Sequence, residues 1–255
     1  MSTGVVNAPG SERMERCCDA LKTHLSGAEK LSIRQTRKGW CQECLGCEAR
    51  DEFKYFKEGQ EEHFATALED SSCCVRFFCA PCHPFKISVV ENGTGTELVS
   101  VDRPCNCPVS ACKCCCYQSA AFTSGGQPMG SIKEKCFCCV PRFVAYDAAD
   151  KELYKMHAPT CLGGMCINCC AEGNPCGKGC CKASLRIYDA SQEKTDGDAP
   201  YAGVILKKPK SLATEVFTDA NAFDVTFPAN ANADDKALLI GSAMFFNANF
   251  FEREN

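Results

Sequence analysis

The sequence lacks any long run of basic residues. Its 255 residues carry a formal net charge of −4 at pH 7, with acidic and basic side chains mixed along the chain. Proteins that bind nucleic acid or anionic membrane surfaces by electrostatics usually carry a basic patch. We therefore expect no nucleic-acid partner.

The first 18 residues, MSTGVVNAPGSERMERCC, contain no apolar stretch long enough for a secretory signal peptide, and Ser2 stands where N-myristoylation requires glycine. The sequence also contains no nucleophile elbow, phosphate-binding loop, dinucleotide fingerprint or pair of catalytic acids. We expect a protein that is kept in the reducing cytosol and is not an enzyme.

Cysteine, in contrast, is abundant, with 25 residues. In a small secreted protein this number would indicate a disulfide scaffold, but a cytosolic location argues against one. The remaining interpretations are thiols that bind metal, thiols that carry acyl chains, and cysteines that act as small buried apolar residues.

Short segments of alternating apolar and polar residues, separated by Gly, Asn, Asp and Pro, follow one another from about Lys30. This pattern is typical of antiparallel strands. The segments begin KLSIRQT, EFKYFKE, EEHFATALED, FKISVV and TELVSV, and continue with YQSAAF, MGSIKEK, RFVAYD, ELYKMH, ASLRIYD, YAGVILKK and DVTFP. A weak internal repeat suggests two equivalent halves of about six strands each. The pattern predicts an all-β protein, one closed barrel of about twelve strands, with two small domains as the alternative.

The segment 237–251 is apolar on every face of a helix and is preceded by Asp234 and Asp235, acids suited to a helix start. Fifteen helical residues reach only about 22 Å, against roughly 30 Å of bilayer hydrocarbon. A barrel of about twelve strands has an interior too wide for its own side chains to fill. We therefore predict that this helix fills the barrel, and a single-pass membrane anchor remains the alternative.

Several motifs resemble the phospholipid scramblase family. They are CCVRFFCAPCHPFKI, DRPCNCP with CKCCCYQ, CCVPRFVAYDAADKELYK, ILKKPKSLATEVFTDA and the C-terminal FDVTFPANANADDKALLIGSAMFFNANFFE. The resemblance implies a tubby-like, twelve-stranded antiparallel barrel around a buried C-terminal helix, calcium-dependent movement of phospholipids between leaflets, and palmitoylated cysteines. It places the barrel domain at 29–252 with its core helix at 237–251. Residues 1–28 replace the family's long proline-rich region and are expected to be a short, polar, disordered tail.

The family's calcium segment maps onto alternate positions of an EF-like loop. These positions are Asp219, Asn221, Phe223, Val225, Phe227 and Asn230. Calcium prefers several oxygen ligands, but only Asp219 is a carboxylate here, and the glycine and bidentate acid of such a loop are missing. The alternative interpretation is a strand whose inward face carries Phe223, Val225 and Phe227.

The family's acylation cluster maps onto Cys112, Cys114, Cys115 and Cys116. Two or more acyl chains give stable membrane anchoring. A zinc site that also uses Cys105 and Cys107 is the alternative.

A second cysteine cluster has spacings suited to a tetrahedral metal such as zinc, namely Cys161, Cys166, Cys169, Cys170, Cys176, Cys180 and Cys181. Reduced loop cysteines without metal are the alternative.

The leading hypothesis is a calcium-responsive phospholipid scramblase-family protein that moves phospholipids in both directions between leaflets. Its expected partners are membrane phospholipids, with homo-oligomerisation left open. Acyl chains would hold it at the cytosolic face of the plasma membrane, and without them it would be in the cytosol or nucleus. The alternatives are a membrane-tethered adaptor barrel that moves no lipid and a thiol-rich zinc-binding protein.

Overall fold

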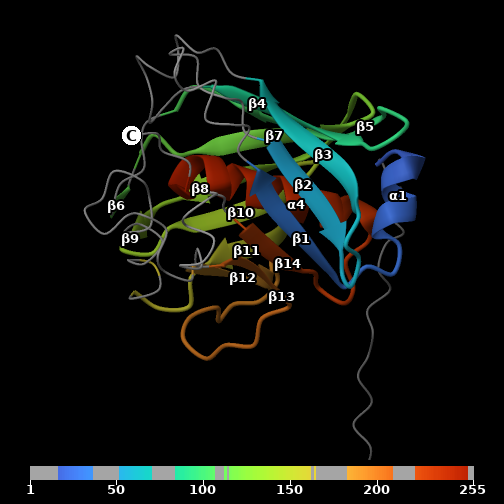
Figure 1. Cartoon of the computed structure of the whole chain (residues 1–255). Coiled ribbons are helices and arrows are strands. Elements are labelled where there is room, and N and C mark those ends of the chain that lie inside the picture. The colour runs from blue at the N-terminus through green and yellow to red at the C-terminus, as the bar shows by residue number, and fades with distance from the viewer. Residues whose placement is uncertain are drawn as a thin grey trace, which may run out of the picture.

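The computed structural model describes residues 17–36, 52–70, 84–106, 112–113, 115–161, 164, 183–208 and 222–251. Within these ranges the chain forms twelve antiparallel strands in a closed barrel, and a helix runs through the barrel (Figure 1). The fold class expected from the sequence is thereby confirmed.

Consecutive barrel strands along the chain are also neighbours in space, and β1 closes the ring by pairing with both β14 and β2. All twelve strands were predicted from alternation. They are β1 (Lys30–Thr36), β2 (Glu52–Lys57), β3 (His63–Asp70), β4 (Phe85–Glu91), β5 (Glu97–Arg103), β7 (Ser119–Ser124), β8 (Gln127–Lys135), β10 (Arg142–Asp147), β11 (Glu152–His157), β12 (Ala183–Asp189), β13 (Gly203–Lys208) and β14 (Ala222–Thr226). Two further short strands, β6 (Cys112–Lys113) and β9 (Phe137–Cys138), form a separate ribbon.

The core helix, α4 (Ala233–Phe246), continues as a π-helical turn, η2 (Asn247–Phe251). It begins four residues before the predicted start at 237. Asn232, rather than an aspartate, is the N-cap: its side chain accepts a hydrogen bond from the backbone N–H of Asp235 at 2.9 Å. The Asp235 carboxylate accepts in return from the Asn232 N–H at 3.3 Å, which completes a capping box.

Every residue of α4 from Ala237 to Phe246 is buried, as the sequence predicted for a helix surrounded by protein. The ring of Phe143 on β10 packs edge-on against Phe245 and Phe246, with centroids 5.8 and 4.9 Å apart. Gly241 lies against Phe122 of β7 so closely that an added Cβ would stand 2.8 Å from its ring. The helix is therefore an integral part of the hydrophobic core. Among the described residues, no helix is both long enough and apolar enough to span a bilayer.

The sequence placed the start of the barrel domain at residue 29, and the structure describes an ordered chain from residue 17. A short helix, α1 (Asp19–Leu25), packs there with Leu21 and Leu25 buried. The Cys17 N–H donates to the Asp234 carboxylate at 2.8 Å, and Lys236 Nζ donates to the Leu25 carbonyl at 3.0 Å. Both partners belong to the first turns of α4, so α1 closes the end of the barrel where α4 begins (Figure 1). Residues 1–16 of the expected tail lie outside the described residues.

Candidate functional site

The predicted acylation cluster lies at the opposite end of the barrel from α1, around the β6–β9 ribbon (Figure 1). Cys112 on β6 is the register partner of Cys138 on β9. The thiols of Cys115 and Cys116 follow β6 and are exposed, and Cys116 adopts a left-handed backbone conformation with φ 55°. Cys114 and the side chain of Cys112 lie outside the described residues. These two thiols of the predicted acylation cluster are thus accessible from solvent.

Other cysteines lie on or near this ribbon in sequence, and Cys161 lies farther along the chain. They are exposed at Cys105, Cys136, Cys138 and Cys161, and half-buried at Cys139. Of these, Cys161 was named in the predicted zinc cluster and Cys105 in the alternative zinc site, whereas Cys136, Cys138 and Cys139 were not singled out from the sequence. Cys138 comes near the predicted acylation cluster because β9 pairs with β6. Strands of two residues are too short to show as alternation in the sequence, so this pairing could not be predicted.

Two positions of the predicted calcium segment, Phe223 and Val225, lie on β14, and their side chains are buried on its inward face. Phe227, directly after the strand, is also buried, while Asn230 lies in an exposed turn before α4. Asp219 and Asn221 lie outside the described residues. The three apolar side chains offer no oxygen to a cation, so oxygen ligands in this segment would come from Asp219, Asn221, Asn230 and backbone carbonyls.

Asp224, between the buried positions of β14, points to the opposite face of the strand. It accepts a hydrogen bond from Ser32 Oγ at 2.5 Å and pairs with Lys208 Nζ at 2.7 Å. Both partners come from neighbouring strands, so this carboxylate links β1, β14 and β13 on the outside of the barrel.

Of the predicted zinc cluster, the structure describes Cys161 alone; the other six cysteines lie outside the described residues. Within the described part of the chain, no group of three or more His, Cys, Asp or Glu side chains is arranged to hold a metal ion.

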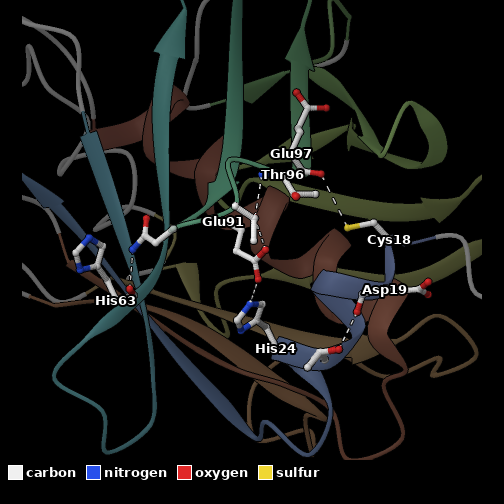
Figure 2. Close-up of polar contacts among 10 residues, drawn as sticks. Cys18, Asp19, His24, His63, Glu91, Thr96 and Glu97 are labelled. Carbon is white, nitrogen blue, oxygen red and sulfur yellow. Dashed lines mark hydrogen bonds and ion pairs between the residues drawn. The ribbon is translucent and has the colours of Figure 1, made fainter.

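A polar contact between α1 and the β4–β5 hairpin was missed in the sequence (Figure 2). Nε2 of His24 lies 2.5 Å from Oε1 of Glu91, and the imidazole stacks on Phe64 with centroids 4.6 Å apart. Hydrogen bonds from Thr94 and then from His24 hold the pKa of Glu91 below its ordinary value. No local pattern reveals this contact, because its two residues are 67 positions apart. The helix α1 itself does have a local signal, the spacing of Cys17, Leu21 and Leu25.

The sequence model of the family described as Scramblase matches residues 9–174 and 175–253. The chain belongs to this family. The match begins before residue 17, in agreement with the packing of α1 onto the barrel.

Curated relatives of the chain carry the scramblase name. Phospholipid scramblase 1 of Homo sapiens is 27% identical over 194 residues, which cover 76% of this chain and 54% of the relative. Phospholipid scramblase 2 of Bos taurus is 28% identical over 76% of this chain and 58% of the relative. Phospholipid scramblase family member 5 of Homo sapiens is 27% identical over 82% of this chain and 69% of its own. The chain therefore spans little more than half the length of the first two relatives. No solved structure matches the chain.

Proposed function

We propose that this protein is a calcium-responsive scramblase that moves phospholipids in both directions between membrane leaflets. The observation that carries the proposal is membership of the Scramblase family across nearly the whole described barrel, together with relatives named phospholipid scramblases. Scrambling makes and breaks no covalent bond, so the proposed function is transport rather than enzymatic catalysis.

A tether to the cytosolic face of the plasma membrane is part of the same proposal. Its support is the exposure of Cys115 and Cys116 next to the β6–β9 ribbon, at one end of the barrel. Acyl chains on these cysteines would place this end at the membrane surface and leave the α1 end in the cytosol.

The proposal is tested with the purified full chain in liposomes that carry a fluorescent-headgroup lipid in both leaflets. An impermeant reductant added outside destroys the fluorescence of the outer leaflet alone, which is about half of the total. With calcium we expect the remaining half to decay as well, and we expect a chelator of calcium to slow this decay at least tenfold. If liposomes with the protein and calcium lose no more fluorescence than protein-free liposomes, the proposal is overturned. The membrane-tethered adaptor is then the remaining function.

Calcium ligation is tested separately with the variant Asp219→Ala/Asn221→Ala. Removal of these two side-chain oxygen ligands should raise the calcium concentration needed for half-maximal scrambling. The matched control is Asp198→Ala, an exposed carboxylate between β12 and β13, which should leave the calcium dependence unchanged. If the double variant responds to calcium as the unmodified chain does, these residues are not ligands.

A further inference from the structure

Charges that are mixed along the sequence are separated between the two ends of the folded barrel (Figure 1). At the α1 end, the turns that join β2 to β3 and β10 to β11 are acidic. Their acids are Glu58, Glu61, Glu62, Asp147, Asp150 and Glu152. The opposite end, beside the β6–β9 ribbon, is called the ribbon end, and there cations gather on the outside of the barrel.

Six cations lie within two residues of the point where their strand reaches the ribbon end. They are Arg34 of β1, Lys54 of β2, Lys86 of β4, Lys135 of β8, Arg142 of β10 and Lys208 of β13, all exposed or half-buried. Three of them form surface ion pairs: Lys135 with Glu152, Arg142 with Asp196 and Lys208 with Asp224. Lys86 lies opposite an acid on β5, Asp102. The two cations on β1 and β2 are arranged differently.

Arg34 and Lys54 face each other directly across β1 and β2. Like charges in this position repel and destabilise a sheet. The Arg34 guanidinium lies over the ring of Phe56, 4.6 Å from its centroid, which positions the cation without neutralising it. Within the described part of the chain, neither Arg34 nor Lys54 has an ion-pair partner. An anion bound from outside would relieve their repulsion.

The neighbouring thiols indicate what kind of anion this surface meets. Cys115 and Cys116 of the predicted acylation cluster are exposed at the same end. A single acyl chain holds a protein only marginally, and a basic patch is a common second signal. We propose that the ribbon end docks on a membrane leaflet rich in anionic phospholipid, with Arg34 and Lys54 contacting the headgroups. This inference rests on the proposed function for the choice of a lipid as the partner.

The charge separation also orients the protein as it docks. Anionic lipids give the leaflet a negative surface potential that attracts cations within about one Debye length, roughly 8–10 Å at physiological salt. The same potential repels the acidic turns at the α1 end. The barrel therefore meets the membrane with its ribbon end first, before any acyl chain is attached.

The test measures binding of the full chain, produced without acylation and with calcium chelated, to sedimenting vesicles. One set of vesicles is phosphatidylcholine alone, and the other also contains phosphatidylserine. We expect binding to the phosphatidylserine vesicles only, and weaker binding as the salt concentration rises. The variant Arg34→Glu/Lys54→Glu should bind at least tenfold more weakly, because two attractions become repulsions.

The matched control is Lys30→Glu/Lys57→Glu. It changes two cations at the α1 ends of the same two strands and lowers the net charge by the same amount. It should bind the phosphatidylserine vesicles like the unmodified chain. Circular dichroism and thermal melts should show both variants folded, since all four side chains lie outside the core.

Equal binding to the two kinds of vesicle would overturn the proposal, and so would an equal loss of binding in the two variants. Displacement from the vesicles by an RNA oligonucleotide at the same phosphate concentration would overturn the lipid assignment. Binding and scrambling are separate readouts. A chain that binds phosphatidylserine vesicles but fails to scramble lipid would keep this inference and lose the proposed function, whereas a chain that scrambles lipid without preferring anionic vesicles would do the reverse.

Discussion

At the scale of the residue, His157 couples the stability of the protein to pH. The imidazole is 2% exposed, stacks on Tyr188 with centroids 4.9 Å apart, and Nδ1–H donates to the Ala158 carbonyl at 2.8 Å. Burial lowers the pKa of His157, and the charges of Arg142 and Arg186 lower it further. The hydrogen bond to the Ala158 carbonyl and the charge of Asp196 oppose this shift but do not cancel it. The folded protein therefore keeps this side chain neutral below the pH at which an exposed histidine charges.

This depressed pKa predicts a loss of stability in mild acid. Because the unfolded chain binds the proton more readily, the free energy of unfolding should fall as the pH drops below about 6.5, by up to about 1.4 kcal/mol per pH unit. His157→Asn keeps a hydrogen-bond donor but cannot titrate, so urea unfolding between pH 7 and pH 5.5 should show a smaller slope. The control His63→Asn alters a half-buried ring on β3 and should retain the slope of the unmodified chain. Equal slopes in His157→Asn and the unmodified chain would contradict the prediction.

Residue-level predictions from the sequence succeeded where a local pattern determines the environment. Alternation on β14 was sufficient to place Phe223 and Val225 inside the barrel, because strand geometry fixes which face each side chain takes. The pairing of His24 with Glu91 and the approach of Gly164 to Cys139 depend on segments far apart in the chain, so no local pattern reveals them.

At the scale of the element, α1 is part of the folded domain. Leu21 and Leu25 are buried, and each should contribute about 1.5–3 kcal/mol. A chain that begins at residue 29 should therefore unfold at least about 6 °C below one that begins at residue 9, at roughly 2–4 °C per kcal/mol for a protein of this size. Differential scanning calorimetry measures the difference, and equal midpoints would restore the boundary expected from the sequence.

Single substitutions in α1 provide a control for that truncation. Leu25→Ala removes a fully buried side chain and should cost about 2–5 kcal/mol. Thr23→Ala, on the exposed face of the same helix, should change the free energy of unfolding by less than about 1 kcal/mol. A comparable loss in both variants would mean that helix formation, rather than packing, is responsible.

The core helix α4 makes a stronger prediction. A chain stopped after Lys236 loses large buried side chains that include Leu238, Met244 and Phe246. Three such side chains at about 1.5–3 kcal/mol each already approach the net stability of a typical protein, about 5–15 kcal/mol. We expect an unfolded or aggregated product by circular dichroism and limited proteolysis. A soluble β-protein with a cooperative melt would show that the barrel folds without its core helix.

At the scale of the whole molecule, the barrel was predictable because its topology is simple. Each barrel strand pairs with the next along the chain, so twelve local patterns in order, together with one helix apolar on all faces, define the architecture. The start of the domain was not predictable by the same reasoning, since the short α1 stands among polar residues and is held by partners on α4. The cysteine sites were predicted only as groups, because 25 thiols give many spacings that fit a metal or an acyl chain.

The two ends of the barrel differ in a way that predicts where the protein resides in a cell. The α1 end is closed by polar contacts, and the ribbon end carries the thiols predicted to be acylated. Changing all four of Cys112, Cys114, Cys115 and Cys116 to Ser should abolish hydroxylamine-sensitive lipid and move the protein from membranes to the cytosol or nucleus, because stable anchoring needs two or more acyl chains. Cell fractionation and metabolic labelling with a fatty-acid analogue measure both effects.

The matched control for this prediction changes an equal number of exposed thiols outside the cluster, Cys105, Cys136, Cys138 and Cys161. It should leave labelling and membrane binding intact, since it spares every predicted acceptor. If the cluster variant stayed at the membrane, anchoring would require another part of the chain. If the control set alone released the protein, the acyl chains would have to be carried by these four thiols. Either result would contradict the assignment of the tether to residues 112–116 and with it the proposed orientation of the barrel on the membrane.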